Sequence, residues 1–367
     1  MKRSAEVTIH PEALQHNLQQ AKKAAPDSKV LAVIKANAYG HGAVSTAGIL
    51  YPFTDGFAVS CISEAVELRE AKIDLPITVL QGHQNDHDLR IAAHHTLRLV
   101  IHEQRQLSLL DNFSGIPATP FDLSIKLDTG MHRLGFDPAL APALHNKLTN
   151  HSLVNPDTLQ FMTHLSCADD KTNEYSAKQI AQFKQSTNAF KNQTSIANSA
   201  GILGWQESHA DWIRPGIMLY GSSPFINNHV GDTAKHYNLQ ATMTFSAPLI
   251  AIHTLKKGDS IGYGATWQCP TDMQVGVVAC GYADGYPRHA KTGTPLWING
   301  RQTQLLGRVS MDMIVIDLSS NNRDNHHGAQ CGDLVECWGE NIHVDTIAYH
   351  AETISYELMC NVGNIQT

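Results

Sequence analysis

Val30-Leu-Ala-Val-Ile-Lys35-Ala-Asn-Ala-Tyr39-Gly-His-Gly42 is the stretch that decides the fold. Its first five residues form an unbroken apolar run, which is typical of a strand buried on both faces of a parallel sheet. Lys35 follows directly, so we expect its amine to lie at the edge of an apolar interior. Burial of this kind lowers the pKa of a lysine and favours the neutral amine, which attacks carbonyl groups to form Schiff bases. The alternative is an ordinary lysine at a strand end whose amine reaches water.

The composition indicates a globular protein of two domains. The chain has 367 residues, which exceeds the usual size of a single core, and 42% of them are hydrophobic. Its net charge of −7, without a cluster of Lys and Arg, argues against nucleic-acid and anionic-membrane partners. No apolar run reaches the roughly 18 residues of a membrane span, and the N-terminus lacks the apolar segment of a signal peptide. The seven cysteines contain no C-x-x-C pair, which fits a reducing compartment, so we expect a cytoplasmic protein.

No metal site is expected from the histidines. The 21 histidines include no H-E-x-x-H motif. His83 and His87 have the spacing of two ligands on a helix, but a turn-like segment separates them and no third ligand follows. Solvated surface histidines explain this pattern better than a metal.

The first two thirds of the chain repeat one pattern, a short apolar run followed by an amphipathic helical segment. Strands that alternate with helices indicate parallel βαβ units, and eight units favour a closed (β/α)8 TIM-type barrel. An open doubly wound sheet would give the same count. We expect a separate opening strand at 5–9, a helix at 11–23, and barrel strands at 30–34, 56–60, 76–80, 97–101, 121–127, 158–163, 194–197 and 216–220.

The pattern changes after a polar linker at 225–235. From Leu239 onward, runs rich in Val and Ile are separated by turn signals such as Asn299-Gly300. We therefore expect an α/β barrel domain over residues 1–235 and a mainly β C-terminal domain over 236–367, with one helix near 344–351.

Polar residues recur at the predicted carboxyl ends of the barrel strands, where such barrels carry their functional side chains. A lysine, two arginines, a histidine and small polar residues would meet at one mouth, which indicates a site for an anionic ligand and a carbonyl group. Six of these residues follow predicted strands, namely Lys35, Tyr39, Arg133, His164, Asn198 and Ser199, and Arg214 leads into the predicted eighth strand.

A further candidate lies in the β-domain. Tyr263 stands between Gly262 and Gly264, neither of which supplies a side chain to pack a core around it. The tyrosine is therefore well placed to be presented into a cleft, and the alternative is a turn tyrosine that caps the domain. No P-loop and no G-x-S-x-G motif occurs, which disfavours nucleotide-dependent and serine-hydrolase functions.

Six segments together resemble bacterial alanine racemase, in the order and at about the spacing of that family. The resemblance implies a barrel that binds pyridoxal 5′-phosphate (PLP), a β-domain after it, alanine as substrate, and a head-to-tail homodimer that shares its active sites. Its product, D-alanine, would supply peptidoglycan. The segments are Ala32–Gly42, Lys126–Gly135, Arg214–Gly221, Gly262–Ala265, Ser310–Asp312 and Ser355–Glu357.

The resemblance also implies how the residues act. Lys35 corresponds to the lysine in Schiff-base linkage to PLP, which is also the base for the D-face of the substrate. Tyr263 of the other subunit corresponds to the base for the L-face, because racemisation needs acid/base groups on both sides of the α-carbon. Arg214 corresponds to the arginine that contacts the pyridine nitrogen and, being always charged, keeps it unprotonated. His164 corresponds to a residue that hydrogen-bonds to this arginine.

Further residues are assigned by the same resemblance. Lys126 matches a lysine that is often carbamylated in the family, where the new charge fixes Arg133; an unmodified lysine packed by the strand is the alternative. Ser195 departs from the family, in which many members have a histidine that stacks on the PLP ring at this position. Tyr39, Asn198, Ser199, Tyr356 and the amides of Gly216 and Ile217 would hold the cofactor, Arg133 and Met311 the substrate carboxylate, and Asp312 and Tyr282 would support the site.

Other functions remain open at this point. A broad-specificity or serine-preferring racemase has the same fold but often carries an export signal, which is absent here. A basic-amino-acid decarboxylase shares the layout but needs a cysteine-bearing partner motif that we do not find. A PLP-carrier protein of the barrel type is much shorter and lacks the β-domain that carries Tyr263.

Overall fold

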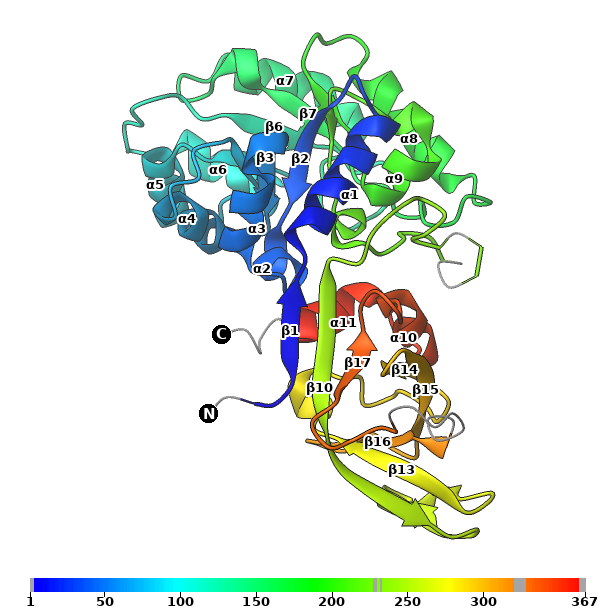
Figure 1. Cartoon of the computed structure of the whole chain (residues 1–367). Helices are drawn as coiled ribbons and strands as arrows, with labels where there is room; N and C mark the ends of the chain where they lie inside the picture. Colours follow the sequence, from blue (N-terminus) through cyan, green and yellow to red (C-terminus); the bar gives the residue numbers. More distant parts are fainter. Residues whose placement is uncertain (1–2, 227–229, 232, 320–327, 363–367) are drawn as a thin grey trace.

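The computed structural model describes residues 3–226, 230–231, 233–319 and 328–362. A barrel surrounded by helices lies above an elongated β-domain in Figure 1. The predicted architecture, a TIM-type barrel followed by a mainly β domain, is confirmed. No helix in the described ranges is long and apolar enough to cross a membrane.

The barrel closes because its last strand pairs with its first. Neighbouring strands are parallel and follow one another in chain order, and Val30 pairs with Ile213 to complete the ring. Nearly every strand residue is buried, as expected for a parallel sheet covered on both faces. The strands are β2 (Lys29–Val33), β3 (Gly56–Val59), β4 (Ile77–Val79), β5 (Arg98–Ile101), β6 (Leu123–Lys126), β7 (Gln160–Met162), β8 (Thr194–Ser195) and β9 (Trp212–Ile213).

The helices form a layer outside the barrel. α1, for example, buries Leu14 and Leu18, whose spacing of four residues places them on one face. The helices of this part are α1 (Pro11–Ala24), α2 (Lys35–Tyr39), α3 (Ala43–Leu50), α4 (Ile62–Glu70), α5 (Asp86–His95), α6 (Gln104–Asp111), α7 (Ala141–Thr149), α8 (Tyr175–Thr187) and α9 (Ser199–Gly204).

The prediction of the eighth strand at 216–220 is wrong. The eighth strand is β9, and the predicted segment forms the short 3-10 helix η5 (Ile217–Tyr220). All residues of η5 are buried, and an apolar run of this length cannot distinguish a buried turn from a buried strand. Gly216, with φ −120° and ψ −97°, ends the extended backbone before η5.

The short element α2 is a left-handed turn. Ala36, Asn37, Ala38 and Tyr39 have φ angles of 52° to 53°, which L-residues other than glycine rarely adopt. Each such residue costs on the order of 1 to 2 kcal/mol, so the surrounding structure must hold the turn. Lys35 therefore stands at the start of a strained segment, between the end of β2 and the turn.

The β-domain is one antiparallel sheet of seven strands. β1 pairs with β10 although it precedes the barrel in sequence, so residues 6–9 lie in this sheet and outside the barrel, to which the predicted boundary assigned them. A separate hairpin is formed by β11 (Ser260–Ile261) and β12 (Trp267–Gln268). In spatial order the sheet contains β1 (Glu6–Ile9), β10 (Met243–Leu255), β13 (Met273–Val278), β16 (Ile314–Asp317), β15 (Arg301–Leu306), β14 (Pro295–Ile298) and β17 (Leu334–Trp338).

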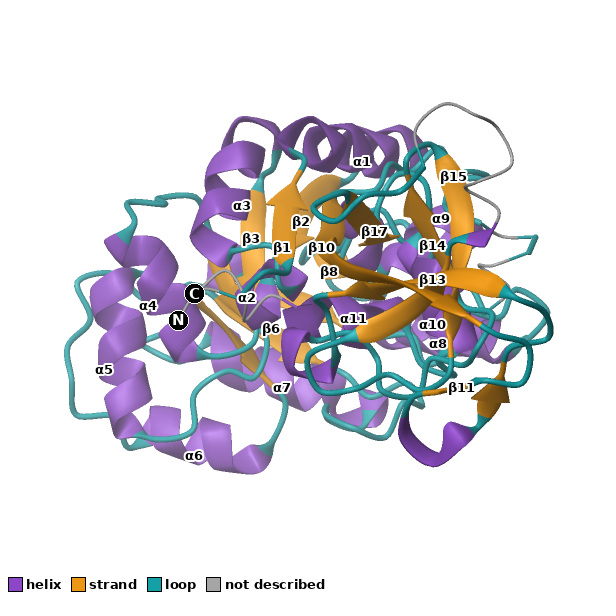
Figure 2. Cartoon of the chain, turned by 60° about the horizontal axis from the view of Figure 1, so that its bottom comes forward, coloured by secondary structure: helices purple, strands orange, loops and turns teal. Residues whose placement is uncertain are grey.

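Two helices join the sheet to the barrel. α10 (Val344–His350) was predicted, whereas α11 (Ser355–Val362) was not. The buried residues Ser355, Leu358, Met359 and Val362 have helical spacing, but the pattern spans only two turns. α11 lies against α2, at the junction of the two domains (Figures 1 and 2).

Candidate active site

A cavity of about 960 Å³ opens where the barrel strands end and the β-domain meets them. Its walls come from the ends of β2, β6, β7 and β8, from η5 and from α11. The structure thus brings together residues that lie more than 300 positions apart. The cavity is lined by Lys35, Tyr39, Lys126, Arg133, His164, Asn198, Ser199, Arg214, Gly216, Ile217 and Tyr356, among others.

Lys35 is half-buried at the wall of this cavity. Burial lowers the pKa of its amine, and the positive charge of Arg133 lowers that pKa further. Glu64 and the thiol of Cys360 act in the opposite direction, with smaller effects on the pKa. The neutral amine is therefore more populated than in an exposed lysine, which suits attack on a carbonyl carbon.

Positive charge dominates the cavity. Lys126 is buried, and burial together with the charges of Arg214 and Arg133 lowers its pKa to about 8. Arg133 is exposed and makes no hydrogen bond or ion pair with any described residue. Cations in a partly desolvated space favour an anionic ligand, such as a carboxylate or a phosphate.

Arg214 is buried among neutral acceptors. Nη1 donates to Oγ of Ser195 at 2.6 Å, and Nη2 donates to the carbonyl oxygens of Thr163 at 2.6 Å and Ile196 at 3.1 Å. The Nδ1 atom of His164 lies 3.5 Å from Nη2. Burial lowers the pKa of Arg214 to about 10, so the guanidinium stays charged at neutral pH. Its Nε donates to no described residue and remains available to a ligand.

Ser195 lies behind Arg214 and does not line the cavity. Its hydroxyl accepts from Arg214 and donates to the carbonyl oxygen of Trp212 at 2.8 Å. In this chain the position therefore supports the arginine, and it offers no surface on which a ring could stack. His164 is half-buried beside Arg214, and the partial burial followed by the charge of Arg214 lowers its pKa well below the usual value. The imidazole is neutral.

Several hydrogen-bond donors that have no acceptor among the described residues lie near Gly216. The hydroxyl of Ser199 accepts from the amide of Gly216 at 2.9 Å, whereas the amide of Ile217 has no acceptor among the described residues. The phenols of Tyr39 and Tyr356 likewise donate to no described residue, and burial raises the pKa of each, so both keep their protons. Uncharged hydroxyls and a free amide that face one space suit a phosphate.

The absence of a side chain at Gly216 keeps this space open. A Cβ atom built there would lie 2.9 Å from Oη of Tyr39, closer than real Cβ atoms approach other atoms. Asn198 has a local role, since its Oδ1 accepts from the amide of Gly201 at 2.9 Å and caps α9.

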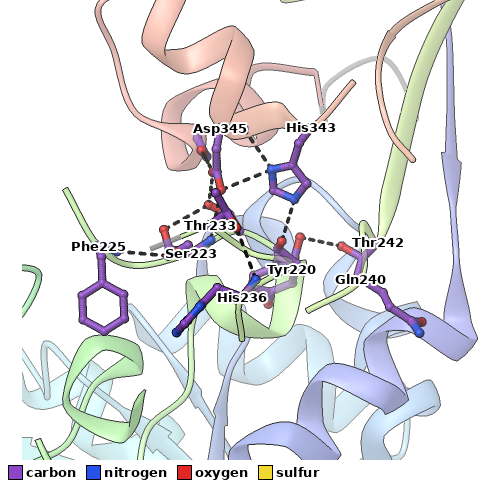
Figure 3. Close-up of polar contacts among 12 residues, drawn as sticks. Tyr220, Ser223, Phe225, Thr233, His236, Gln240, Thr242, His343 and Asp345 are labelled. Atoms are coloured by element: carbon purple, nitrogen blue, oxygen red, sulfur yellow. Dashed lines mark hydrogen bonds and ion pairs between the residues drawn. The ribbon is translucent and has the colours of Figure 1, made fainter. Parts of the chain in front are cut away.

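Tyr39 is held by a stack that reaches into the β-domain. Its ring stacks on Tyr220, with centroids 4.6 Å apart, and His41 packs against Tyr220 at 4.7 Å. Nε2 of His41 lies 2.8 Å from Oγ1 of Thr242. The hydroxyl of Thr242 donates to the carbonyl oxygen of Tyr220 at 2.9 Å (Figure 3). Burial lowers the pKa of His41 to about 4, so this network contains a neutral imidazole.

Asp345 fixes the opposite wall. Its buried carboxylate accepts from the hydroxyls of Ser222 and Ser355 and, at 3.2 Å, from the amide of Ser223. Ser355 is the first residue of α11 and directly precedes Tyr356. The contact therefore fixes the start of α11 and the position of Tyr356 relative to the barrel.

His343 extends this connection. Its Nδ1 lies 3.2 Å from Oδ2 of Asp345, and its Nε2 lies 2.8 Å from the carbonyl oxygen of Gly221 (Figure 3). Burial acts to lower the pKa of His343, but the hydrogen bond and negative charge of Asp345 outweigh it and raise the pKa above its usual 6.5. The protonated form thus stabilises the junction of the two domains.

Four predicted residues of the β-domain lie outside this cavity, whereas Tyr356 lines it. Tyr263 is 71% exposed in the short 3-10 helix η6 (Tyr263–Ala265), and neither it nor Tyr282, Met311 or Asp312 lines the cavity of its own chain. Tyr282 belongs to η7 (Tyr282–Asp284), and the guanidinium of Arg3 pairs with both Asp284 and Asp312. These side chains are presented outward, where a second chain could receive them.

Sequence reasoning missed two carboxylates that shape the cavity, Glu64 and Asp345. An acidic residue in the first turn of a helix is typical of a helix N-terminus, so neither position signals a second role. Nothing in the sequence pattern indicates that Ser195 contacts Arg214. The described part of the chain contains no group of three or more His, Cys, Asp and Glu side chains that could hold a metal ion.

Comparison with known proteins identifies similar chains. Residues 9–224 match the family model "Alanine racemase, N-terminal domain", and residues 242–366 match "Alanine racemase, C-terminal domain". The chain is 45% identical over 360 residues to a protein named alanine racemase from Coxiella burnetii (strain CbuG_Q212), covering 98% of this chain and 96% of that protein.

Solved structures agree with this similarity. The biosynthetic alanine racemase from Pseudomonas aeruginosa has a TM-score of 0.91 and 40% identity, covering 99% of this chain and 97% of that one. An alanine racemase from Bartonella henselae with covalently bound pyridoxal phosphate has a TM-score of 0.84 and 26% identity, covering 98% of this chain and 97% of the other.

Proposed function

The chain belongs to the alanine racemase family, and from this premise we propose how its residues interconvert L- and D-alanine. The activity itself follows from membership over nearly the whole length, since curated relatives that are 43 to 45% identical carry this name. The proposal concerns the cofactor, the two bases and the assembly. The observation that carries it is the cavity in which the amine of Lys35 and several donors without partners face the same space.

The residues present fit PLP. Lys35 would hold the cofactor covalently through its amine, and the unpaired Nε of Arg214 would donate to the pyridine nitrogen. Tyr39, Tyr356, Ser199 and the free amide of Ile217 would hold the phosphate, in the space that Gly216 leaves open. Asn198 would contribute by capping α9 beside Ser199. When bound, PLP makes the α-proton of an amino acid acidic enough to be removed.

Two residues would move that proton. Lys35 exchanges a proton with the α-carbon on the D-face, and the phenol of Tyr263 does so on the L-face. Because Tyr263 is exposed and does not line the cavity of its own chain, it would serve the cavity of a second chain. We therefore propose a homodimer with shared active sites, in which Tyr282 and Asp312 support the donated segment.

The substrate carboxylate would bind Arg133, whose guanidinium has no partner among the described residues, and the backbone amide of Met311 from the second chain. Lys126 would carry a carbamate, because its pKa of about 8 makes the neutral amine, the form that reacts with CO₂, far more populated than in an exposed lysine. The carbamate would neutralise part of the positive charge and fix Arg133. His164 would support Arg214 as a neutral imidazole.

Membership of the family supports a proposal for the cellular role. We propose that the enzyme is cytoplasmic and supplies D-alanine for peptidoglycan; the seven cysteines, all free, are compatible with a reducing compartment. We also propose residues 1–235 as the unit that binds the cofactor and 236–367 as the unit that donates the second base, with β1 contributed to the sheet of the latter.

The experiment that tests the proposal is reduction of the purified chain with borohydride in the presence of PLP, followed by peptide mapping. We expect loss of the visible absorbance and a reduced pyridoxyl group on Lys35. Racemisation rates for alanine, serine, lysine and arginine distinguish the alternative, a broad-specificity or serine-preferring racemase. Lysine or serine turnover comparable to that of alanine would favour the alternative, and a chain that is colourless with PLP would refute both.

A further inference from the structure

The carboxylate of Glu64 joins two strand ends. Glu64 lies in the first turn of α4, and its Oε2 accepts from the amide of Ser60 at 2.6 Å, just beyond the end of β3. Its Oε1 accepts from the amide of Ala36 at 2.8 Å, in the turn that follows β2. A carboxylate can accept from both amides at once because each oxygen has its own lone pairs.

The contact with Ala36 acts on the strained part of the chain. Ala36 is the first of the four consecutive residues with φ near 53°, and its amide belongs to the peptide plane that follows Lys35. The orientation of that plane determines where the backbone of Lys35 points. Tyr39, the last of the four residues, lines the same cavity. A left-handed turn of non-glycine residues persists only where contacts from outside hold it.

Other contacts hold the turn at its far end. Oδ1 of Asn37 accepts from the amide of Ala43 at 2.7 Å, and the ring of His41 lies 3.1 Å from the carbonyl oxygens of Ala38 and Tyr39. Glu64 is the side chain that holds the near end, next to Lys35. Glu64 therefore does more than cap α4, because the contact with Ser60 alone would be enough for a cap.

We propose that Glu64 is a positioning residue of the active site, which holds the left-handed turn so that Lys35 and Tyr39 face the cofactor. The inference rests on the proposed roles of those two residues. The charge of Glu64 adds a second effect, because it opposes burial and Arg133 and so raises the pKa of Lys35, as the thiol of Cys360 also does. Loss of Glu64 should therefore change both the position of the Lys35 amine and the pH at which this amine reacts.

The test compares the full-length wild type with Glu64→Gln, Glu64→Asp and the control Glu67→Gln. A glutamine has one acceptor oxygen and no charge, so it leaves one of the two amides without an acceptor. An aspartate keeps the charge in the first turn of α4 but is too short to reach both amides. Glu67 lies one turn further along α4, is exposed, and does not line the cavity. PLP is titrated into each cofactor-free chain at several pH values, and the absorbance of the bound cofactor gives the dissociation constant and the pH midpoint of binding.

We expect Glu64→Gln to weaken PLP binding about tenfold or more and to shift the midpoint to lower pH, in the direction of a lower pKa for Lys35. Glu64→Asp should weaken binding with a midpoint near that of the wild type, and it carries the test if Glu64→Gln does not fold. Glu67→Gln should behave as the wild type. If Glu64→Gln leaves the dissociation constant of PLP and the pH midpoint unchanged, Glu64 only caps α4 and the proposal is refuted. This holds even if the melting temperature of the variant is lower. A wild type that binds no PLP would instead refute the proposed function and this inference with it.

Discussion

Replacement of Gly216 by alanine tests the proposed phosphate site directly. Alanine at Gly216, where φ is −120° and ψ is −97°, adds a methyl group that projects toward Tyr39. That methyl group would lie 2.9 Å from Oη of Tyr39 and 3.6 Å from its Cζ. The first distance is too short for a stable contact, so the phenol of Tyr39 must move by a few tenths of an ångström.

The cost of this movement should appear in cofactor binding. The ring of Tyr39 is stacked on Tyr220 and cannot retreat into the core, but its hydroxyl can move toward the open cavity. In the proposed site, the phosphate of PLP would occupy that space. Overpacking of this kind costs about 1 to 3 kcal/mol, which corresponds to about 5- to 150-fold weaker binding. The free energy of unfolding of the cofactor-free chain is measured as well, because a cost of placing alanine at ψ −97° would appear there and not only in PLP binding.

Gly48 provides a matched control. It lies in α3, no atom lies within 4 Å of the Cβ that it lacks, and alanine is the better helix former by about 1 kcal/mol. Gly48→Ala should therefore increase stability and leave PLP binding unchanged. PLP titration by absorbance and urea denaturation measure the two quantities for both variants. Binding by Gly216→Ala within twofold of the wild type would refute the reasoning, because the methyl group would then not compete with the phosphate.

Three further predictions follow from the site. Tyr263→Phe should keep PLP binding while kcat/KM for racemisation falls about 100- to 10,000-fold in both directions, as measured by circular dichroism of alanine; unchanged turnover would remove Tyr263 from the mechanism. The peptide that contains Lys126 should gain the mass of one CO₂ under mild conditions, increasingly as the pH rises through about 8 and bicarbonate is added, and a constant mass would contradict the carbamate. His343 has a folded-state pKa above its usual 6.5, so its stabilisation of the fold is complete below about pH 6.5 and is lost as the pH rises through that folded value. The difference in unfolding free energy between the wild type and His343→Gln should therefore shrink from low to high pH in urea titrations, and a difference that grows would refute the assignment.

The sequence determined those features that depend on local pattern. The alternation of buried strands with helices predicts the barrel, because an apolar run of five residues and a helical spacing of three or four are each readable within one element. The rule that functional side chains follow parallel strands is enough to assign Lys35 and Arg133 to one mouth of the barrel. Arg214 precedes the strand predicted at 216–220, and it lies at this mouth because the real eighth strand is β9 (Trp212–Ile213). Local pattern failed at Ile217–Tyr220, where burial alone does not distinguish a 3-10 turn from a strand.

The tertiary structure decided the contacts between distant elements. Asp345 reaches Ser222 across 123 positions and Glu64 reaches Ala36 across 28, and no periodicity encodes either pairing. The left-handed turn after Lys35 likewise cannot be predicted from the sequence, because alanine and asparagine do not by themselves indicate four positive φ angles. The physical reason is that a strained conformation is stable only when other parts of the fold supply its hydrogen-bond partners, and the folded chain alone brings those partners together.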